Sequence, residues 1–112
     1  MVKLVALYRK PEPDKIEEFV KHYNEVHVPL VKKTPGLLRV EITNLSGAPM
    51  GEAPYFLMCE MYYESMDSMN AANASPEGKA AGRDLMTFAM KYVTLFWGDV
   101  LESGEARAPK AD

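Results

Sequence analysis

His27 is the residue of this 112-residue chain whose type and position most clearly favour chemistry. At about 100° per residue, it falls within the angular span of a helical apolar stripe made by Ile16, Phe19, Val20 and Tyr23. It is therefore predicted to face the interior, whereas His22 lies well off that stripe and is expected in solvent. An imidazole titrates near neutral pH, so His27 could serve as a general acid or base.

Two interpretations of His27 stay open at this point. A buried imidazole needs a hydrogen-bond partner or a ligand, so His27 is either a core histidine held internally or a histidine facing a pocket. Two features favour the pocket. Pro29 follows closely and should break the helix, because proline has no N–H and clashes with the preceding turn. No fixed partner for His27 lies nearby in the sequence.

Aromatic residues recur on the elements that would surround such a pocket. The residues expected to line it are Tyr8, Phe19, Tyr23, Phe88 and Trp97. An aromatic stripe is also typical of an ordinary core, so this alternative stays open. Asp84, at the edge of the second helix's apolar stripe, is added to the pocket set. It could pair with a basic residue, orient His27, or lie at the surface as a solvated carboxylate.

The remaining chemistry-bearing residues give little indication of a cofactor. Cys59 is the only cysteine and lies in the apolar run 56–59, so it is interpreted as a buried reduced thiol rather than a nucleophile. No phosphate-binding loop, dinucleotide fingerprint or zinc-ligand spacing is present in the sequence. We therefore predict no metal and no cofactor. His27 would be the only candidate axial ligand for haem, and no specific haem binding is expected.

Composition sets further bounds on the function. A chain of this length has room for one domain. Its net charge of −3 and pI of about 5.4 argue against nucleic-acid binding. No apolar run approaches the length of a membrane span, so no membrane partner is expected. Together with the single cysteine, these features predict a cytoplasmic protein.

The positions of strands and helices predict an α+β fold. Apolar, β-branched and aromatic residues predict four strands, at 2–9, 37–45, 55–63 and 91–101. A helix with Asp14 as its predicted N-cap connects the first two, and a two-part helix capped by Ser65 and Ser75 connects the last two. The order βαββαβ is that of a ferredoxin-like fold with a four-stranded antiparallel sheet and both helices on one face.

The helices leave the other face of the sheet uncovered. The first, third and fourth strands carry apolar residues on both sides, whereas a half-solvated antiparallel sheet should alternate apolar and polar residues. An apolar face of that extent is larger than a monomer usually exposes. A homodimer formed through the open sheet face is therefore predicted.

A spaced motif in the first helix resembles the EthD family, named for ethyl tert-butyl ether degradation. The motif is Phe19-x3-Tyr23-x3-His27-x-Pro29, followed by Pro35-Gly36-Leu37. The second half is similar too, in Ala74 to Gly78, Asp84 and Phe88. The resemblance spans residues 1–101, and residues 102–112 are expected to form a flexible tail. The resemblance to this family implies a dimeric α/β barrel whose pocket lies between the helices and the sheet, with His27 facing that pocket.

The resemblance also implies a class of function. It favours a protein of a degradative or oxidative pathway that binds a small organic ligand. As an enzyme it would be a cofactor-free oxidoreductase or monooxygenase, lyase or isomerase, with His27 as general acid or base. A non-catalytic accessory protein that protects or delivers the ligand is the alternative, because fold alone does not decide among these activities.

Overall fold

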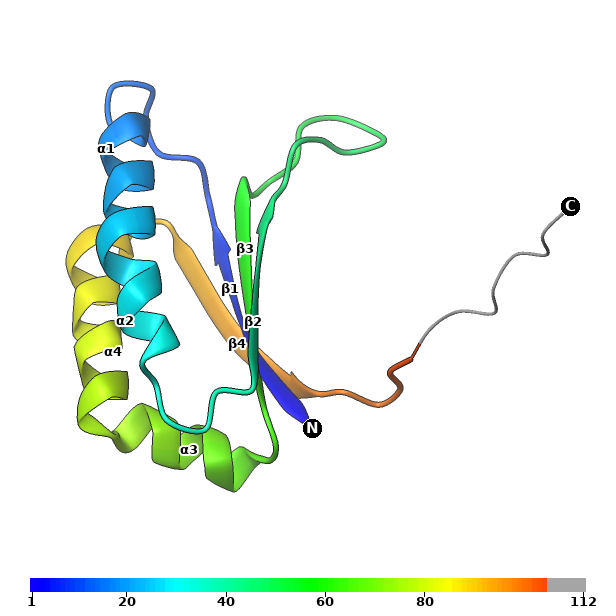
Figure 1. Cartoon of the computed structure of the whole chain (residues 1–112). Helices are drawn as coiled ribbons and strands as arrows, with labels where there is room; N and C mark the ends of the chain where they lie inside the picture. Colours follow the sequence, from blue (N-terminus) through cyan, green and yellow to red (C-terminus); the bar gives the residue numbers. More distant parts are fainter. Residues whose placement is uncertain (105–112) are drawn as a thin grey trace, which may run out of the picture.

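The structure, a computed structural model that describes residues 1–104, is built on one antiparallel sheet (Figure 1). Its strands are β1 (Val2–Tyr8), β2 (Arg39–Asn44), β3 (Leu57–Tyr63) and β4 (Val93–Asp99), in the spatial order β2-β3-β1-β4. Each strand lies within its predicted range, and the ferredoxin-like α+β fold is confirmed. Most of the predicted flexible tail, residues 105–112, lies outside the described residues.

The first connection is one helical segment in three parts, and it differs from the prediction. It runs through α1 (Ile16–His22), the π-helical turn η1 (Tyr23–His27) and α2 (Val28–Lys32). The expected break at Pro29 is wrong. Hydrogen bonding shifts from the fourth to the fifth preceding carbonyl just before this proline, as the Val28 N–H bonds the Tyr23 carbonyl. The wider turn lets the helix continue through a residue that has no N–H.

The helix starts are predicted correctly in one connection and wrongly in the other. Asp14 does not cap α1, whose N-cap is Lys15 without a side-chain hydrogen bond. In the second connection, Ser65 caps α3 (Met66–Ala74) and Ser75 caps α4 (Pro76–Ala89), as predicted. The Ser75 backbone is extended, so the chain turns sharply between these two helices.

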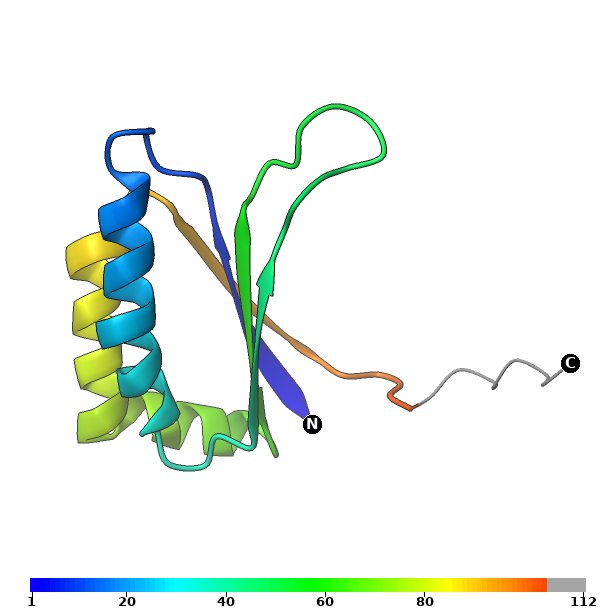
Figure 2. The ribbon, with the colours of Figure 1, turned by 45° about the horizontal axis from the view of Figure 1, so that its top comes forward.

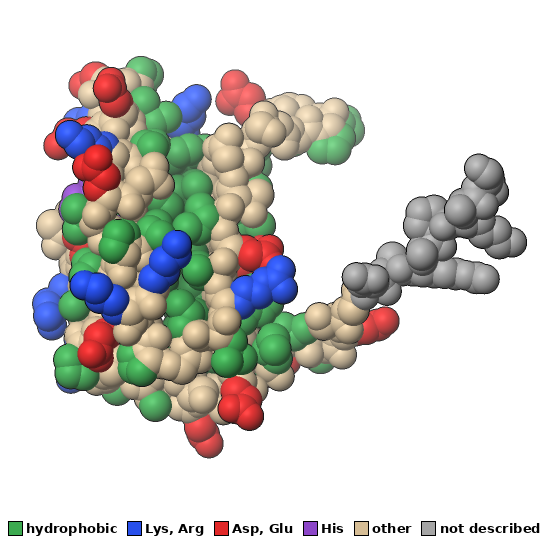
Figure 3. Space-filling view, viewed as in Figure 1, with side chains coloured by type: hydrophobic (Ala, Val, Ile, Leu, Met, Phe, Trp, Pro, Cys, Tyr) green, Lys and Arg blue, Asp and Glu red, His purple; other side chains and the backbone are tan. Residues whose placement is uncertain are grey.

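The helical segments form one layer against the sheet. The α1–η1–α2 segment and α4 lie side by side over one face, and α3 lies across one end of the layer (Figures 1 and 2). Apolar side chains gather between the helical layer and the sheet (Figure 3). Alternate strand residues point into this space, so Ala6 of β1 lies beside Cys59 of β3 and Leu95 of β4. The core therefore lies between the sheet and the helices.

No helix of the described chain covers the opposite face of the sheet, called here the open face (Figure 2). The strand register places four apolar side chains on it: Val5, Leu7, Met58 and Phe96. It is less uniformly apolar than the sequence suggested. Glu60 stands opposite Val5 and pairs with Lys3 at 2.7 Å, and Arg39 pairs with Glu41 near the β2 edge. The open face thus combines an apolar centre with ion pairs.

Two glycines of α4 give a matched test of how the helices pack. A Cβ on Gly78 would lie 2.1 Å from the carbonyl oxygen of Ala72 in α3, whereas a Cβ on Gly82 would meet nothing within 4 Å. Gly78→Ala should lower the melting temperature by several degrees, because overpacking costs about 1–3 kcal/mol. Gly82→Ala should raise it slightly, because alanine favours a helix over glycine by up to about 1 kcal/mol. Equal shifts in calorimetry would contradict this packing.

Candidate functional site

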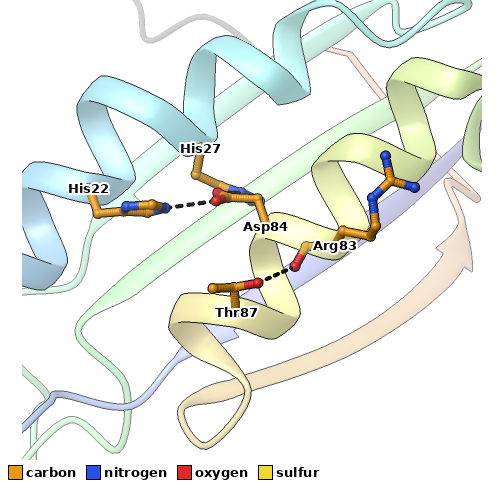
Figure 4. A network of polar contacts seen from close by, with 5 residues as sticks. All are labelled: His22, His27, Arg83, Asp84 and Thr87. Carbon is orange, nitrogen blue, oxygen red and sulfur yellow. Dashed lines mark hydrogen bonds and ion pairs between the residues drawn. The ribbon is translucent and has the colours of Figure 1, made fainter.

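One carboxylate joins both histidines of the chain (Figure 4). Oδ2 of Asp84, on α4, lies 2.9 Å from Nδ1 of His27, at the end of η1. Its other oxygen, Oδ1, lies 2.8 Å from Nε2 of His22, at the end of α1. The Asp84 side chain is only 13% exposed. The two helical segments that cover the sheet therefore meet through a hydrogen-bonded His–Asp–His network.

The π-helical turn is what brings the two histidines to the same carboxylate. Residues five apart on an α-helix differ by about 140° in direction, which is why the sequence placed His22 in solvent. In a π turn the hydrogen bonds span five residues, so residues five apart come close to alignment. The solvent prediction for His22 is wrong, since its side chain is 31% exposed and bonded to Asp84. The surface interpretation of Asp84 is wrong too, and the alternative in which it orients His27 is the one observed.

Burial and hydrogen bonding define the state of the His27 ring. His27 is only 4% exposed, and this burial lowers its pKa below the ordinary value, against the opposing effect of Asp84. The neutral ring is therefore favoured at neutral pH. With Nδ1 directed at a carboxylate, the single ring proton lies on Nδ1 and donates to Oδ2, which leaves Nε2 as an acceptor.

The accessible side of His27 faces a cavity of about 360 Å³ between the sheet and the helices, called here the His27 cavity. Tyr8 of β1 and Trp97 of β4 also line it. Much of its remaining wall is apolar and includes Leu4, Ala6, Met61, Leu85 and Leu95. Polar groups also line it, from Thr34, Tyr63, Asn73 and Lys79. No hydrogen bond reaches Nε2 of His27 from any described residue. The volume is near the lower end of the range for small-molecule pockets, so it suits a molecule of one or two rings.

Comparisons with known proteins show which family the chain resembles. The EthD domain family model matches residues 14–91, which include His22, His27 and Asp84. The chain belongs to the EthD family. It is 46% identical to an EthD family protein from Bacillus halodurans, whose crystal structure superposes with a TM-score of 0.85 over 90% of this chain and 99% of that one. The family resemblance seen in the sequence is confirmed.

Two further relatives extend the comparison. An uncharacterized 11.0 kDa protein of the thcB–thcC intergenic region of Rhodococcus erythropolis is 30% identical over 100 residues, or 88% of this chain and 94% of its own. A dimeric ferredoxin-like protein of unknown function from Thermobifida fusca has a TM-score of 0.59 at 17% identity, over 88% of this chain and 90% of that one. The latter likeness is one of fold alone.

The structure divides the predicted aromatic pocket residues among three places. Tyr8 and Trp97 line the His27 cavity, while Tyr23 is buried in the core against Tyr8. Phe19 and Phe88 line a different hollow of about 390 Å³, between α1 and the end of α4, where charged side chains form much of the wall. Phe88 also packs against both imidazoles, with ring centroids 4.6 Å from His22 and 5.0 Å from His27.

Sequence reasoning placed only Tyr8, His27 and Trp97 correctly in the cavity wall and missed the rest of it, including Cys59 and Lys79. Cys59 is buried as predicted, and burial raises the pKa of its thiol to about 11, so it stays protonated at neutral pH. Side chains alternate between the two faces of a strand, so the alternation in β3 could have placed Cys59 on the side that faces the cavity.

Within residues 1–104, no three or more His, Cys, Asp or Glu side chains are grouped so as to hold a metal ion. In the same part of the chain, no helix has both the length and the apolar character needed to cross a bilayer.

Proposed function

We propose that this EthD-family protein is an enzyme that binds a small, largely apolar organic molecule in the His27 cavity and transfers a proton through Nε2 of His27. The observation that carries the proposal is the asymmetric environment of this ring. Nδ1 is held by Asp84, while Nε2 has no protein partner among the described residues and the ring lines an apolar cavity. A neutral imidazole in this position can act as a general base.

The network would assist the base in two ways. Asp84 fixes the ring orientation and the tautomer, so Nε2 is ready to accept a proton from the bound molecule. When Nε2 takes that proton, the electron pair stays on the substrate and the ring becomes an imidazolium. Asp84 then stabilises the new positive charge through its hydrogen bond to Nδ1. Isomerisation and cofactor-free oxygenation of a carbanion both begin with such a step.

Replacing His27 tests this proposal against the accessory-protein alternative. The wild type and His27→Gln would be incubated with small aromatics, quinones and lactones, and both binding and conversion would be followed, the latter by mass spectrometry. Turnover should fall at least about 100-fold in His27→Gln, as expected on removing a general base. Binding of the converted compound should persist.

His22→Gln is the matched control, because His22 contacts the same carboxylate but does not line the His27 cavity. It should lose less than about tenfold in turnover. Tight binding by the wild type without conversion of any compound would favour the accessory role. Conversion that is unchanged in His27→Gln would contradict the assignment of the base.

We also propose that the protein forms a homodimer through the open face. Phe96 is 45% exposed there, and its strand neighbour Val5 is largely covered by surrounding side chains at 8% exposed. The ferredoxin-like protein of similar fold from Thermobifida fusca is dimeric. Apolar side chains on the open face, with the Lys3–Glu60 and Arg39–Glu41 pairs beside them toward β2, suit a self-complementary interface.

Phe96→Glu should therefore convert the dimer to a monomer in sedimentation velocity, because a charge would be buried without a partner. Met86→Glu is the control. Met86 is an equally exposed apolar residue on α4, away from the sheet, and its substitution should leave the dimer intact. A wild-type protein that sediments as a monomer at micromolar concentration would exclude this interface.

A further inference from the structure

Three buried tyrosines adjoin the His27 cavity and have no role in the His–Asp–His network: Tyr8 and Tyr63 line it, and Tyr23 lies behind Tyr8. Tyr8, only 1% exposed, lines the cavity from β1. Tyr23, 2% exposed, lies behind it on η1, with the two ring centroids 5.3 Å apart in an edge-on arrangement. Tyr8 is also in edge contact with Phe19. The rings are thus fixed by packing, which makes the positions of their hydroxyl groups well defined.

The hydroxyls of Tyr8 and Tyr23 are neighbours without a hydrogen bond between them. The Tyr23 hydroxyl is the only fully enclosed side-chain nitrogen or oxygen without a partner among residues 1–104. It is a neighbour of the Tyr8 hydroxyl and the Cys59 thiol but meets neither at hydrogen-bond geometry. The Tyr8 hydroxyl has the Tyr23 hydroxyl as its neighbour and is not one of the fully enclosed atoms without a partner. Because Tyr8 lines the cavity, its remaining free surface opens into that space.

Unpaired buried hydroxyls are uncommon, because a polar group removed from water without a partner destabilises the fold. Both of these groups are donors at physiological pH, since burial raises the pKa of Tyr8 and of Tyr23 well above the ordinary value. In an apolar cavity, a free O–H donor is matched by an oxygen acceptor on the occupant. The His27 ring lines the same cavity and provides an acceptor.

We propose that the Tyr8 hydroxyl binds a carbonyl oxygen of the ligand, so that the occupant of the His27 cavity is an apolar ketone or lactone. This inference rests on the proposed function and names its substrate class. A donor and a base in one cavity suit proton removal from the carbon next to a carbonyl. The proton passes to Nε2 of His27, the C–H electron pair forms a C=C bond, and the C=O π pair moves to oxygen. The enolate oxygen then accepts the Tyr8 hydrogen bond, which strengthens as negative charge develops.

Tyr23 is a positioning residue in this arrangement. A small reorientation would let its hydroxyl donate to the Tyr8 oxygen, which directs the Tyr8 hydrogen toward the cavity. Hydrogen bonds in such a chain polarise one another, so the Tyr8 donor becomes stronger. Tyr23 itself does not line the cavity, and its effect on a ligand passes through Tyr8.

A matched pair of probes isolates the carbonyl interaction. 1-Tetralone and tetralin share a two-ring skeleton of suitable size, and only the first has a carbonyl group. Trp97, the only tryptophan, lines the cavity and reports binding by its fluorescence. The wild type should bind tetralone about three- to tenfold more tightly than tetralin, as one neutral hydrogen bond provides. Tyr8→Phe should remove this preference without changing the affinity for tetralin.

Two further variants and an infrared measurement complete the test. Tyr23→Phe should leave an intermediate preference, and Tyr55→Phe, a tyrosine outside this cavity, should leave it unchanged. The infrared carbonyl band of bound tetralone should move to lower frequency in the wild type and return in Tyr8→Phe. Equal affinity for both probes, or a tetralone preference that survives in Tyr8→Phe, would overturn the carbonyl site but leave the cavity as a binding site. Failure of the wild type to bind either probe would contradict the proposed function as well.

Discussion

The carboxylate of Asp84 holds together the parts of this molecule that matter for function. It comes from α4 and accepts hydrogen bonds from imidazoles at the ends of α1 and η1, so it links the two helical segments that cover the sheet. Hydrogen bonds to a charged group contribute about 1.5–3 kcal/mol each to stability. A single side chain therefore helps to fix the helical layer and also determines which nitrogen of His27 faces the cavity.

That carboxylate can act in this way only because the helix widens before it reaches Pro29. In a regular α-helix, His22 and His27 would point in different directions, and one carboxylate could not reach both. The π turn at η1 aligns them and carries the helix past the proline. The π turn thus has two consequences: it lets both histidines reach Asp84, and it sets the direction of the His27 ring. The cavity forms next to it, where the His27 ring meets the apolar side of β1, β3 and β4.

Particular residues show which parts of this arrangement could be predicted from the sequence. The four strands, the capping serines and the inward direction of His27 depend on local pattern, and the structure agrees with each. The pairing of Asp84 with His27 joins residues 57 positions apart, and no local pattern encodes it. The π turn was hidden for a different reason, since proline was expected to end a helix rather than widen it. The aromatic residues were assigned to one pocket, but Phe19 and Phe88 line a separate hollow. Periodicity predicts which face of a helix is buried, but it does not predict which cavity a side chain on that face will line.

The central claim is that His27 is a neutral base whose free nitrogen faces the cavity, and nitrogen-15 NMR tests this directly. Spectra of uniformly labelled protein distinguish the two neutral tautomers from the imidazolium. At pH 7, His27 should be neutral with its proton on Nδ1, because burial lowers its pKa and Asp84 accepts a hydrogen bond from that nitrogen. On acidification it should stay neutral below about pH 6.5, the ordinary midpoint of a histidine. A proton on Nε2 in the neutral ring, or an imidazolium at pH 7, would contradict the account.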